Sequence, residues 1–308
     1  MEEILRLMPS EIERAVRFQI GNRWKELQEI RFRLNRPIEL NFHQKVEWVN
    51  ETIFTLKDSL HLLSQLSEHS LYRLEDELRE GYITIAGGHR VGLAGEVNTE
   101  NGSVKQLKHI TFFNIRIARE IIDLSTPYLP YIYEKNSFLN TLIIGAPQTG
   151  KTTMIRDLAR NISTGDSERN PKKVGIVDER SEIAACLNGV PQHQIGMRTD
   201  VMDACPKVDG MMMMIRSMSP EVLIVDEIGK KEDVAALMEA INAGVTVICS
   251  VHGHSLEDIE KRPTLKVLFE HRVFHRFMIL EKTNDHYFTV HIANEVGKLI
   301  TSNMVGKR

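Results

Sequence analysis

The stretch TLIIGAPQTGKT, residues 141–152, decides the fold that this sequence predicts. From Gly145 onward it fits the pattern G-x-x-x-x-G-K-[ST], in which glycines allow backbone amides to turn inward around phosphate groups. An apolar run precedes the loop, and the helical pattern TTMIRDLARNI follows it at 152–162. A helix that begins here directs its positive amino end at the anion. The stretch therefore predicts a phosphate-binding loop between a strand and a helix.

This loop supplies the residues that we expect to bind ATP. In the motif the lysine, Lys151, reaches the β- and γ-phosphates as a point charge, and the hydroxyl group of Thr152 binds Mg²⁺. The alternative, a glycine-rich turn without a ligand, does not account for the strand and helix on its two sides. The expected nucleotide-binding residues are Gly145, Ala146, Pro147, Gln148, Thr149, Gly150, Lys151, Thr152 and Thr153.

Further apolar runs downstream indicate a mostly parallel sheet. The runs VGIVD at 174–178, VLIVD at 222–226 and VTVICSV at 245–251 alternate with helical segments. Continuous apolar runs of this kind are typical of strands that are buried on both faces. We therefore expect residues 138–308 to form an α/β domain, in which helices flank the sheet.

Two carboxylates end the run at 222–226. At the carboxyl end of a strand beside the phosphate loop, Asp226 is placed to hold Mg²⁺ and its water shell. Glu227 follows it and is placed to polarise the attacking water. An aspartate that caps the strand is the alternative, and the upstream phosphate loop favours the metal-binding interpretation.

Other strand ends carry weaker candidates. The cluster DERSE, residues 178–182, is either a second set of carboxylates facing the nucleotide or a solvated strand end that caps the next helix. His252 is either a sensor of the γ-phosphate or a structural histidine. Arg216 either approaches the phosphates or a neighbouring subunit, or is exposed near a helix end. The run MMMM at 211–214 cannot lie on one side of a helix, and it indicates either adaptable packing or a subunit contact.

Residues 1–125 have a different, α+β pattern. The expected elements are helices over 2–20 and 57–79, the latter with a break near 67–70, strands over 29–34, 38–42, 81–97 and 104–118, and a hairpin turn at 98–102. The prolines of TPYLPYIYEKNS, residues 126–137, favour a linker or hinge there. Arg116 and Arg119 either reach a nucleotide from this domain or lie on the exposed face of a strand.

Composition and charge narrow the classes of function. The 308 residues carry a net charge of −3, which does not indicate a nucleic-acid binder by bulk charge. The three cysteines have no metal-type spacing and favour a reducing compartment. No stretch approaches the roughly 18–20 apolar residues that span a bilayer, and the charged N-terminus lacks the pattern of a signal peptide. We therefore expect a soluble, cytoplasmic protein that partners recruit to a membrane.

The order of these motifs resembles that of the secretion-superfamily ATPases, the hexameric motors of type II and type IV secretion and of pilus assembly. GAPQTGKTT, VDERSEI, IRSMSPEVLIVDEIG and SVHGHSLED are similar, in that order, to their Walker A, Asp box, Walker B and His box. EIRFRLNRPIEL resembles the opening of their N-terminal domain. Over nearly the whole chain, GGHRVGLAGEV, FNIRIARE and VDERSEIAACLNGVPQHQIGMRTDVMD resemble the stage III sporulation AA family of endospore-forming bacteria.

This resemblance implies a RecA-like P-loop ATPase domain that follows a smaller α+β domain, with ATP and Mg²⁺ as cofactors. It implies a homo-oligomeric ring, a hexamer in the related motors, which works in the mother-cell cytoplasm on membrane proteins of a channel complex facing the forespore. Many secretion motors have Gly-Glu where this chain has Asp226-Glu227, so Asp226 adds a carboxylate on the Mg²⁺ side. The catalytic candidates are Lys151, Glu179, Glu182, Arg216, Glu227 and His252, with Arg116 and Arg119 as the arginines of the first domain.

The sequence leaves two alternatives to an ATPase motor. Some related P-loop ATPases act on single-stranded nucleic acid and append an R-x-x-x-H domain. The near match here, Arg272 to His275, has the wrong spacing, and the acidic balance also disfavours this function. A scaffold that uses ATP only to assemble is disfavoured by the presence of Lys151, Asp226 and Glu227.

Overall fold

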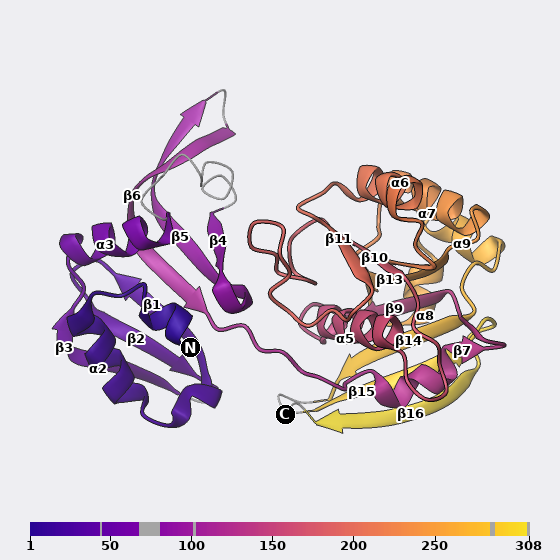
Figure 1. Cartoon of the computed structure of the whole chain (residues 1–308), viewed down its shortest axis with the longest axis horizontal. Coiled ribbons are helices and arrows are strands. Elements are labelled where there is room, and N and C mark those ends of the chain that lie inside the picture. The colour runs from indigo at the N-terminus through magenta and orange to yellow at the C-terminus, as the bar shows by residue number, and fades with distance from the viewer. Residues whose placement is uncertain (44, 68–80, 101–102, 284–286, 307–308) are drawn as a thin grey trace. The chain divides into compact units, whose positions relative to one another are not determined.

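The chain divides into two compact units, Met1–Arg119 and Glu120–Arg308, which Figure 1 draws as separate sheets with their helices. The structure is a computed structural model that describes residues 1–43, 45–67, 81–100, 103–283 and 287–306. Among the described residues, no helix is both long enough and apolar enough to cross a membrane.

The first unit is a six-stranded antiparallel sheet of order β3-β2-β1-β6-β5-β4, with helices that share its core. In α2, Ile12, Val16 and Ile20 recur every four residues and are buried, so one stripe of the helix packs against the strands. A capping box, in which Thr55 and Asp58 exchange backbone and side-chain hydrogen bonds, starts α3. The elements are α1 (Glu2–Leu5), α2 (Ser10–Ile20), β1 (Leu27–Arg33), β2 (Pro37–Phe42), β3 (Val46–Ile53), α3 (Leu56–Leu66), β4 (Tyr82–Ile85), β5 (His89–Glu100) and β6 (Ser103–Arg116), with short 3₁₀ helices at Arg23–Lys25 and Ala86–Gly88.

The first unit departs from the predicted elements in several places. The single helix expected over 2–20 is wrong, because Pro9 lacks a backbone N–H and separates α1 from α2. Strand β3 was not predicted. Helix α3 ends at Leu66, and most of the remaining helix expected up to residue 79 lies outside the described residues, as do positions 101–102 of the expected hairpin turn.

The second unit is an eight-stranded sheet of order β11-β10-β12-β13-β9-β14-β15-β16. The strands from β11 to β14 are parallel, and β15 and β16 add an antiparallel edge. The apolar runs expected to be strands are β9, β10, β12 and β13. The elements are β7 (Tyr133–Glu134), β8 (Ser137–Phe138), β9 (Thr141–Gly145), α5 (Lys151–Thr164), β10 (Val174–Asp178), β11 (Thr199–Asp203), α6 (Lys207–Met218), β12 (Val222–Val225), α7 (Lys231–Asn242), β13 (Thr246–His252), α8 (Leu256–Glu260), α9 (Lys266–Glu270), β14 (Arg276–Lys282), β15 (Tyr287–Asn294) and β16 (Leu299–Gly306), preceded by a 3₁₀ helix at Thr126–Tyr131.

Both faces of this sheet are covered by apolar side chains from helices. Ile143 and Ile224 belong to one buried cluster, together with residues of α5. Their chain neighbours Leu142 and Leu223 belong to the other cluster, together with residues of α6 and α7. Because successive side chains of a strand point to opposite faces, each continuous apolar run contributes side chains to both clusters. The predicted α/β class with a mostly parallel, helix-flanked sheet is confirmed.

The methionine run in α6 is divided between core and solvent. Met211 and Met214, three residues apart, are fully buried, whereas 52% of Met213 is exposed. This spacing places Met211 and Met214 on the helix face that packs on the sheet.

The expected linker at 126–137 is instead a packed part of the second unit. Its two prolines lie within the 3₁₀ helix Thr126–Tyr131, where their fixed φ is compatible with the backbone. Tyr128 and Ile132 are fully buried in the core that contains α5. The two units therefore separate before this segment, between Arg119 and Glu120.

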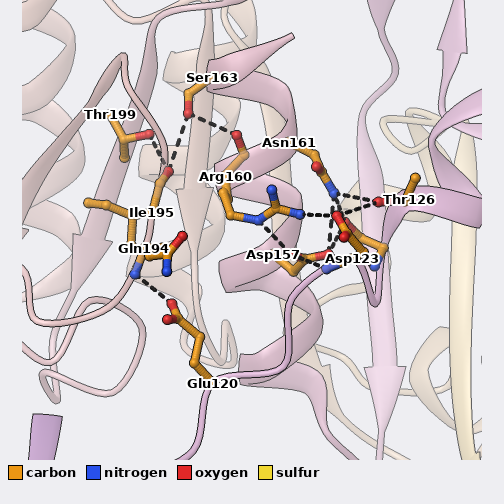
Figure 2. A network of polar contacts seen from close by, with 11 residues as sticks. Glu120, Asp123, Thr126, Asp157, Arg160, Asn161, Ser163, Gln194, Ile195 and Thr199 are labelled. Atoms are coloured by element: carbon orange, nitrogen blue, oxygen red, sulfur yellow. Dashed lines mark hydrogen bonds and ion pairs between the residues drawn. The ribbon is translucent and has the colours of Figure 1, made fainter. Parts of the chain in front are cut away.

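A buried carboxylate holds the start of the second unit against α5, as Figure 2 shows. Asp157 of α5 accepts hydrogen bonds from the backbone N–H groups of Asp123 at 3.1 Å and Ser125 at 2.7 Å. It also accepts one from the Ser125 hydroxyl at 2.8 Å and one from Arg160 Nε at 2.8 Å. Asn161 donates to the Ser125 hydroxyl oxygen at 2.8 Å. Residues 123–125 are thereby fixed to the helix that begins at the phosphate loop.

We expect Asp157→Ala to destabilise the second unit by about 3 kcal/mol, because it leaves Arg160 and two backbone N–H groups without their buried acceptor. Glu168→Ala removes an exposed carboxylate and should cost less than about 0.5 kcal/mol. Urea unfolding followed by circular dichroism measures both. Tryptophan fluorescence measures unfolding of the first unit alone, because both tryptophans of the chain, Trp24 and Trp48, lie in it. Equal unfolding midpoints for the two variants would contradict this account of the Asp157 network.

Candidate functional site

The phosphate loop connects β9 to α5 at the carboxyl edge of the second sheet. A Cβ atom at Gly145 would lie 2.4 Å from Thr149 Oγ1, so a larger residue here would have to displace the Thr149 side chain. Gly150 precedes α5 with a φ of 93°, a conformation that L side chains rarely adopt. Lys151 is the first residue of α5. The backbone N–H groups of the first helical turn, which have no partner within the helix, therefore lie at the loop.

The side chain of Lys151 is folded back into the loop. Its Nζ donates hydrogen bonds to the carbonyl oxygens of Gly145 at 2.9 Å and Ala146 at 3.0 Å, and it lies 3.0 Å from His252 Nδ1. Because an ammonium group can only donate hydrogen bonds, Nδ1 accepts from Lys151 and Nε2 carries the ring N–H. Burial lowers the pKa of Lys151, against the opposing effect of the Glu227 and Asp226 charges.

The carboxylate of Asp226, the residue directly after β12, reaches the start of α5. Thr152 Oγ1 donates to Asp226 Oδ2 at 3.2 Å. The hydroxyl group of Ser250, which is buried in the intervening strand β13, bonds the other oxygen of Asp226 and accepts the backbone N–H of Glu227 at 2.9 Å. Sequence reasoning missed Ser250, although a polar residue within the apolar run at 245–251 was a signal.

Glu227 is held from two sides. His252 Nε2 lies 2.7 Å from its Oε1, and Arg180 Nη1 donates to its Oε2 at 3.3 Å. Its backbone has a φ of 51°, which is uncommon for a residue other than glycine. A continuous path of contacts thus runs from Lys151 through His252 to Glu227.

The acidic cluster after β10 contains both structural and cleft-lining groups. Asp178 is only 1% exposed and accepts the backbone N–H groups of Glu182 at 2.8 Å and Ala184 at 2.9 Å, so it shapes the following loop. Glu179 forms an ion pair with Lys207 of α6. A small cleft beside the phosphate loop is lined by Asp178, Glu179, Arg180, Glu182, Lys207, Asp226 and Glu227.

The three arginine candidates lie outside this cluster of contacts. Arg216 is exposed in the last turn of α6, with no hydrogen bond or ion pair to the part of the chain that the structure describes. Arg116 lies 3.4 Å from Glu29 within the first unit. Arg119 donates to the carbonyl oxygen of Leu27 at 2.7 Å, also within the first unit. Their role toward a nucleotide stays a prediction.

The oxygen groups at this edge fit a magnesium ion that is held mainly by phosphates. Mg²⁺ usually keeps several waters and takes one or two protein ligands together with phosphate oxygens. The Thr152 hydroxyl and the Asp226 carboxylate are oxygen groups of this kind, and they lie 3.2 Å apart. The described residues contain no cluster of three or more His, Cys, Asp or Glu side chains that would form a metal site by themselves.

Comparison with known proteins gives one family over almost the whole chain. A family described as "Sporulation stage III, protein AA" matches residues 1–300. Stage III sporulation protein AA of Bacillus subtilis (strain 168) is 56% identical over 282 residues, which cover 92% of this chain and 91% of that protein. A more distant relative, the uncharacterized protein ycf45 of Porphyra purpurea, is 25% identical over 267 residues, 86% of this chain and 43% of that protein.

Solved structures show the same fold at low sequence identity. The ATPase DotB of Legionella pneumophila has a TM-score of 0.59 and 13% identity, and the match covers 98% of this chain and 82% of that one. The pilus retraction motor PilT, solved with bound ADP, has a TM-score of 0.62 and 15% identity, and the match covers 92% and 82%. The chain therefore shares the fold of these two proteins.

The buried Asp178 predicts a measurable pH dependence of stability. Burial, together with the charge of Asp203, raises the pKa of Asp178 from 3.8 to about 6, although backbone N–H groups oppose the shift. Between pH 7 and pH 5 the folded chain therefore takes up a proton that the unfolded chain does not bind. Over this range the wild type should gain about 1 kcal/mol of unfolding free energy relative to Asp178→Asn. Urea unfolding of both proteins at the two pH values measures this difference, and no change or a relative loss for the wild type would contradict it.

Proposed function

The chain belongs to the sporulation stage III protein AA family, and from this premise we propose that it is an Mg²⁺-dependent ATP hydrolase, the motor of a sporulation complex. The observation that carries the proposal is the Thr152–Asp226 contact at 3.2 Å, with Glu227 next to it at the same sheet edge. This contact joins the phosphate loop to the strand that ends in the metal-binding and water-orienting acids.

The phosphate loop would bind the triphosphate of ATP. The backbone N–H groups of residues 145–152 and the amino end of α5 favour anionic oxygens. Lys151 would exchange its bonds to the carbonyl oxygens of Gly145 and Ala146 for bonds to the β- and γ-phosphates. Burial lowers the pKa of Lys151 and so disfavours its charged form. Phosphate oxygens would replace the neutral carbonyl acceptors with charged ones, and this would favour the ammonium form.

Thr152 and Asp226 would hold Mg²⁺ at the phosphates. When bound, the metal ion neutralises charge on the β- and γ-phosphate oxygens. Ser250 keeps the Asp226 carboxylate fixed through its second oxygen, so that Oδ2 stays directed at Thr152.

Glu227 would orient the attacking water, and His252 would keep Glu227 in place. Because His252 Nδ1 accepts from Lys151, its Nε2–H donates to Glu227 Oε1. This bond would hold one oxygen of the Glu227 side chain in place beside the attacking water. Glu179 and Glu182 line the neighbouring cleft and would face the same nucleotide.

We further propose that the chain works as a homo-oligomeric ring in the mother-cell cytoplasm, peripherally attached to membrane proteins of a channel complex. DotB and PilT, which share the fold, are an ATPase and a pilus retraction motor. In this ring Arg116, Arg119 or Arg216 would neutralise the charge that develops on the γ-phosphate. A change in ATP state would then alter the arrangement of the two units and act on the membrane partners.

Phosphate release from Mg-ATP tests the proposal. The wild type should turn over ATP, with a specific activity that rises with protein concentration because subunits share sites in the ring. Glu227→Gln keeps the size of the side chain but removes its charge, and it should lower turnover by at least about 100-fold while nucleotide still binds.

Two results would contradict this proposal. Equal turnover in wild type and Glu227→Gln would exclude Glu227 as the water-orienting group. Nucleotide-dependent assembly with no phosphate release from the wild type would identify a scaffold instead of a motor.

A further inference from the structure

Arg180 contacts the oxygen of Glu227 that His252 leaves free. Arg180 Nη1 lies 3.3 Å from Glu227 Oε2, whereas His252 Nε2 lies 2.7 Å from Oε1. Each oxygen of the carboxylate therefore has its own partner. One partner comes from the loop after β10 and the other from the end of β13, so the carboxylate is held between two neighbours of its own strand.

The sheet register explains why Arg180 reaches this position. Strands β10 and β12 are parallel neighbours, and Val177 pairs with Val225. Arg180 and Glu227 therefore leave adjacent strands at the same edge. The loop that carries Arg180 is fixed, because the buried Asp178 binds the backbone N–H groups of Glu182 and Ile183 at 2.8 and 2.9 Å.

The same loop is also bound to the phosphate-loop helix. Arg156 of α5 donates to the carbonyl oxygens of Glu182 at 2.6 Å and Ile183 at 2.5 Å. Arg180 is thus attached to a segment that is tied to both β10 and α5. Its position relative to the phosphate loop is set within one subunit.

The geometry points to Arg180 as the residue that positions Glu227 for the attacking water, within its own subunit. This inference rests on the proposed function, because it takes Glu227 as the water-orienting group. Arg180 acts through Glu227 and is therefore a positioning residue. Arg180 Nη1 and His252 Nε2 each hold one oxygen of the carboxylate, which a single partner would leave free to rotate.

The exposure of the pair separates this role from a structural one. The Arg180 side chain is 66% exposed and that of Glu227 is 22% exposed. Exposed ion pairs contribute little to stability, so losing Arg180 should barely change folding. A misplaced Glu227, in contrast, lowers the rate of the chemical step, because small errors in position are costly at a reacting centre.

Steady-state phosphate release and binding of a non-hydrolysable Mg-ATP analogue, on the full chain, test the inference. Arg180→Ala should lower kcat by about 10- to 100-fold, with KM and the Kd for the analogue within about two-fold of wild type. Arg180→Lys retains the charge on a side chain of different length and donor geometry and should give an intermediate kcat. Arg14→Ala, a change of an exposed arginine on α2, is the matched control and should behave as wild type.

Mixing two variants tests whether Arg180 acts within its own subunit. Equal amounts of Arg180→Ala and Glu227→Gln should give no more turnover than the average of the two proteins measured alone. If Arg180 served the site of a neighbouring subunit, an Arg180→Ala subunit next to a Glu227→Gln subunit would regain activity. Such recovery would overturn the inference.

The remaining outcomes separate this inference from the proposed function. An active wild type with an equally active Arg180→Ala variant would overturn the positioning role and leave the ATPase proposal intact. A parallel loss of kcat and analogue affinity would also overturn it, since Arg180 would then bind the nucleotide directly. A wild type that releases no phosphate would overturn both.

Discussion

The contact between Thr152 and Asp226 is the interaction on which the site depends. Thr152 lies in α5 after β9, and Asp226 directly follows β12. These two strands are not neighbours, because β13 lies between them in the sheet. Ser250 of β13 fills this gap by binding Asp226 and the backbone of Glu227. The parallel register aligns the carboxyl ends of these strands, so the loop at 145–152, Asp226 and Glu227 meet at one edge.

Helix α5 connects the phosphate loop to two other segments of the second unit by hydrogen bonds. Its first turn presents Lys151 and Thr152 to the site, and its next turn carries two buried charged side chains, Arg156 and Asp157. Arg156 binds the carbonyl oxygens of the loop after β10, and Asp157 binds the backbone of residues 123–125. One helix therefore connects the phosphate loop, the loop after β10 and residues 123–125 through hydrogen bonds that are buried or partly buried.

The sequence predicts those parts of the fold that are determined by residues close together along the chain. Strands buried on both faces appear as continuous apolar runs, and the loop at 145–152 needs particular glycines, so β9, β10, β12 and β13 were predictable. The antiparallel edge strands β15 and β16 lack such a run and were missed. The prolines at 127 and 130 are compatible with both a hinge and a 3₁₀ helix. The segment forms the 3₁₀ helix because Tyr128 is buried in the core of the second unit. Ser250 and Arg180 depend on strand order and register, which one sequence does not reveal.

Equilibrium binding of a fluorescent, non-hydrolysable ATP analogue to the full chain tests the central claim most directly. The account predicts saturable binding that is strengthened by Mg²⁺, and that is lost in Lys151→Ala although circular dichroism shows the variant to be folded. The Mg²⁺ effect should disappear in Asp226→Asn, because the metal ion then lacks its carboxylate. Binding of equal strength in wild type and a folded Lys151→Ala variant, or no binding to the wild type, would contradict the account.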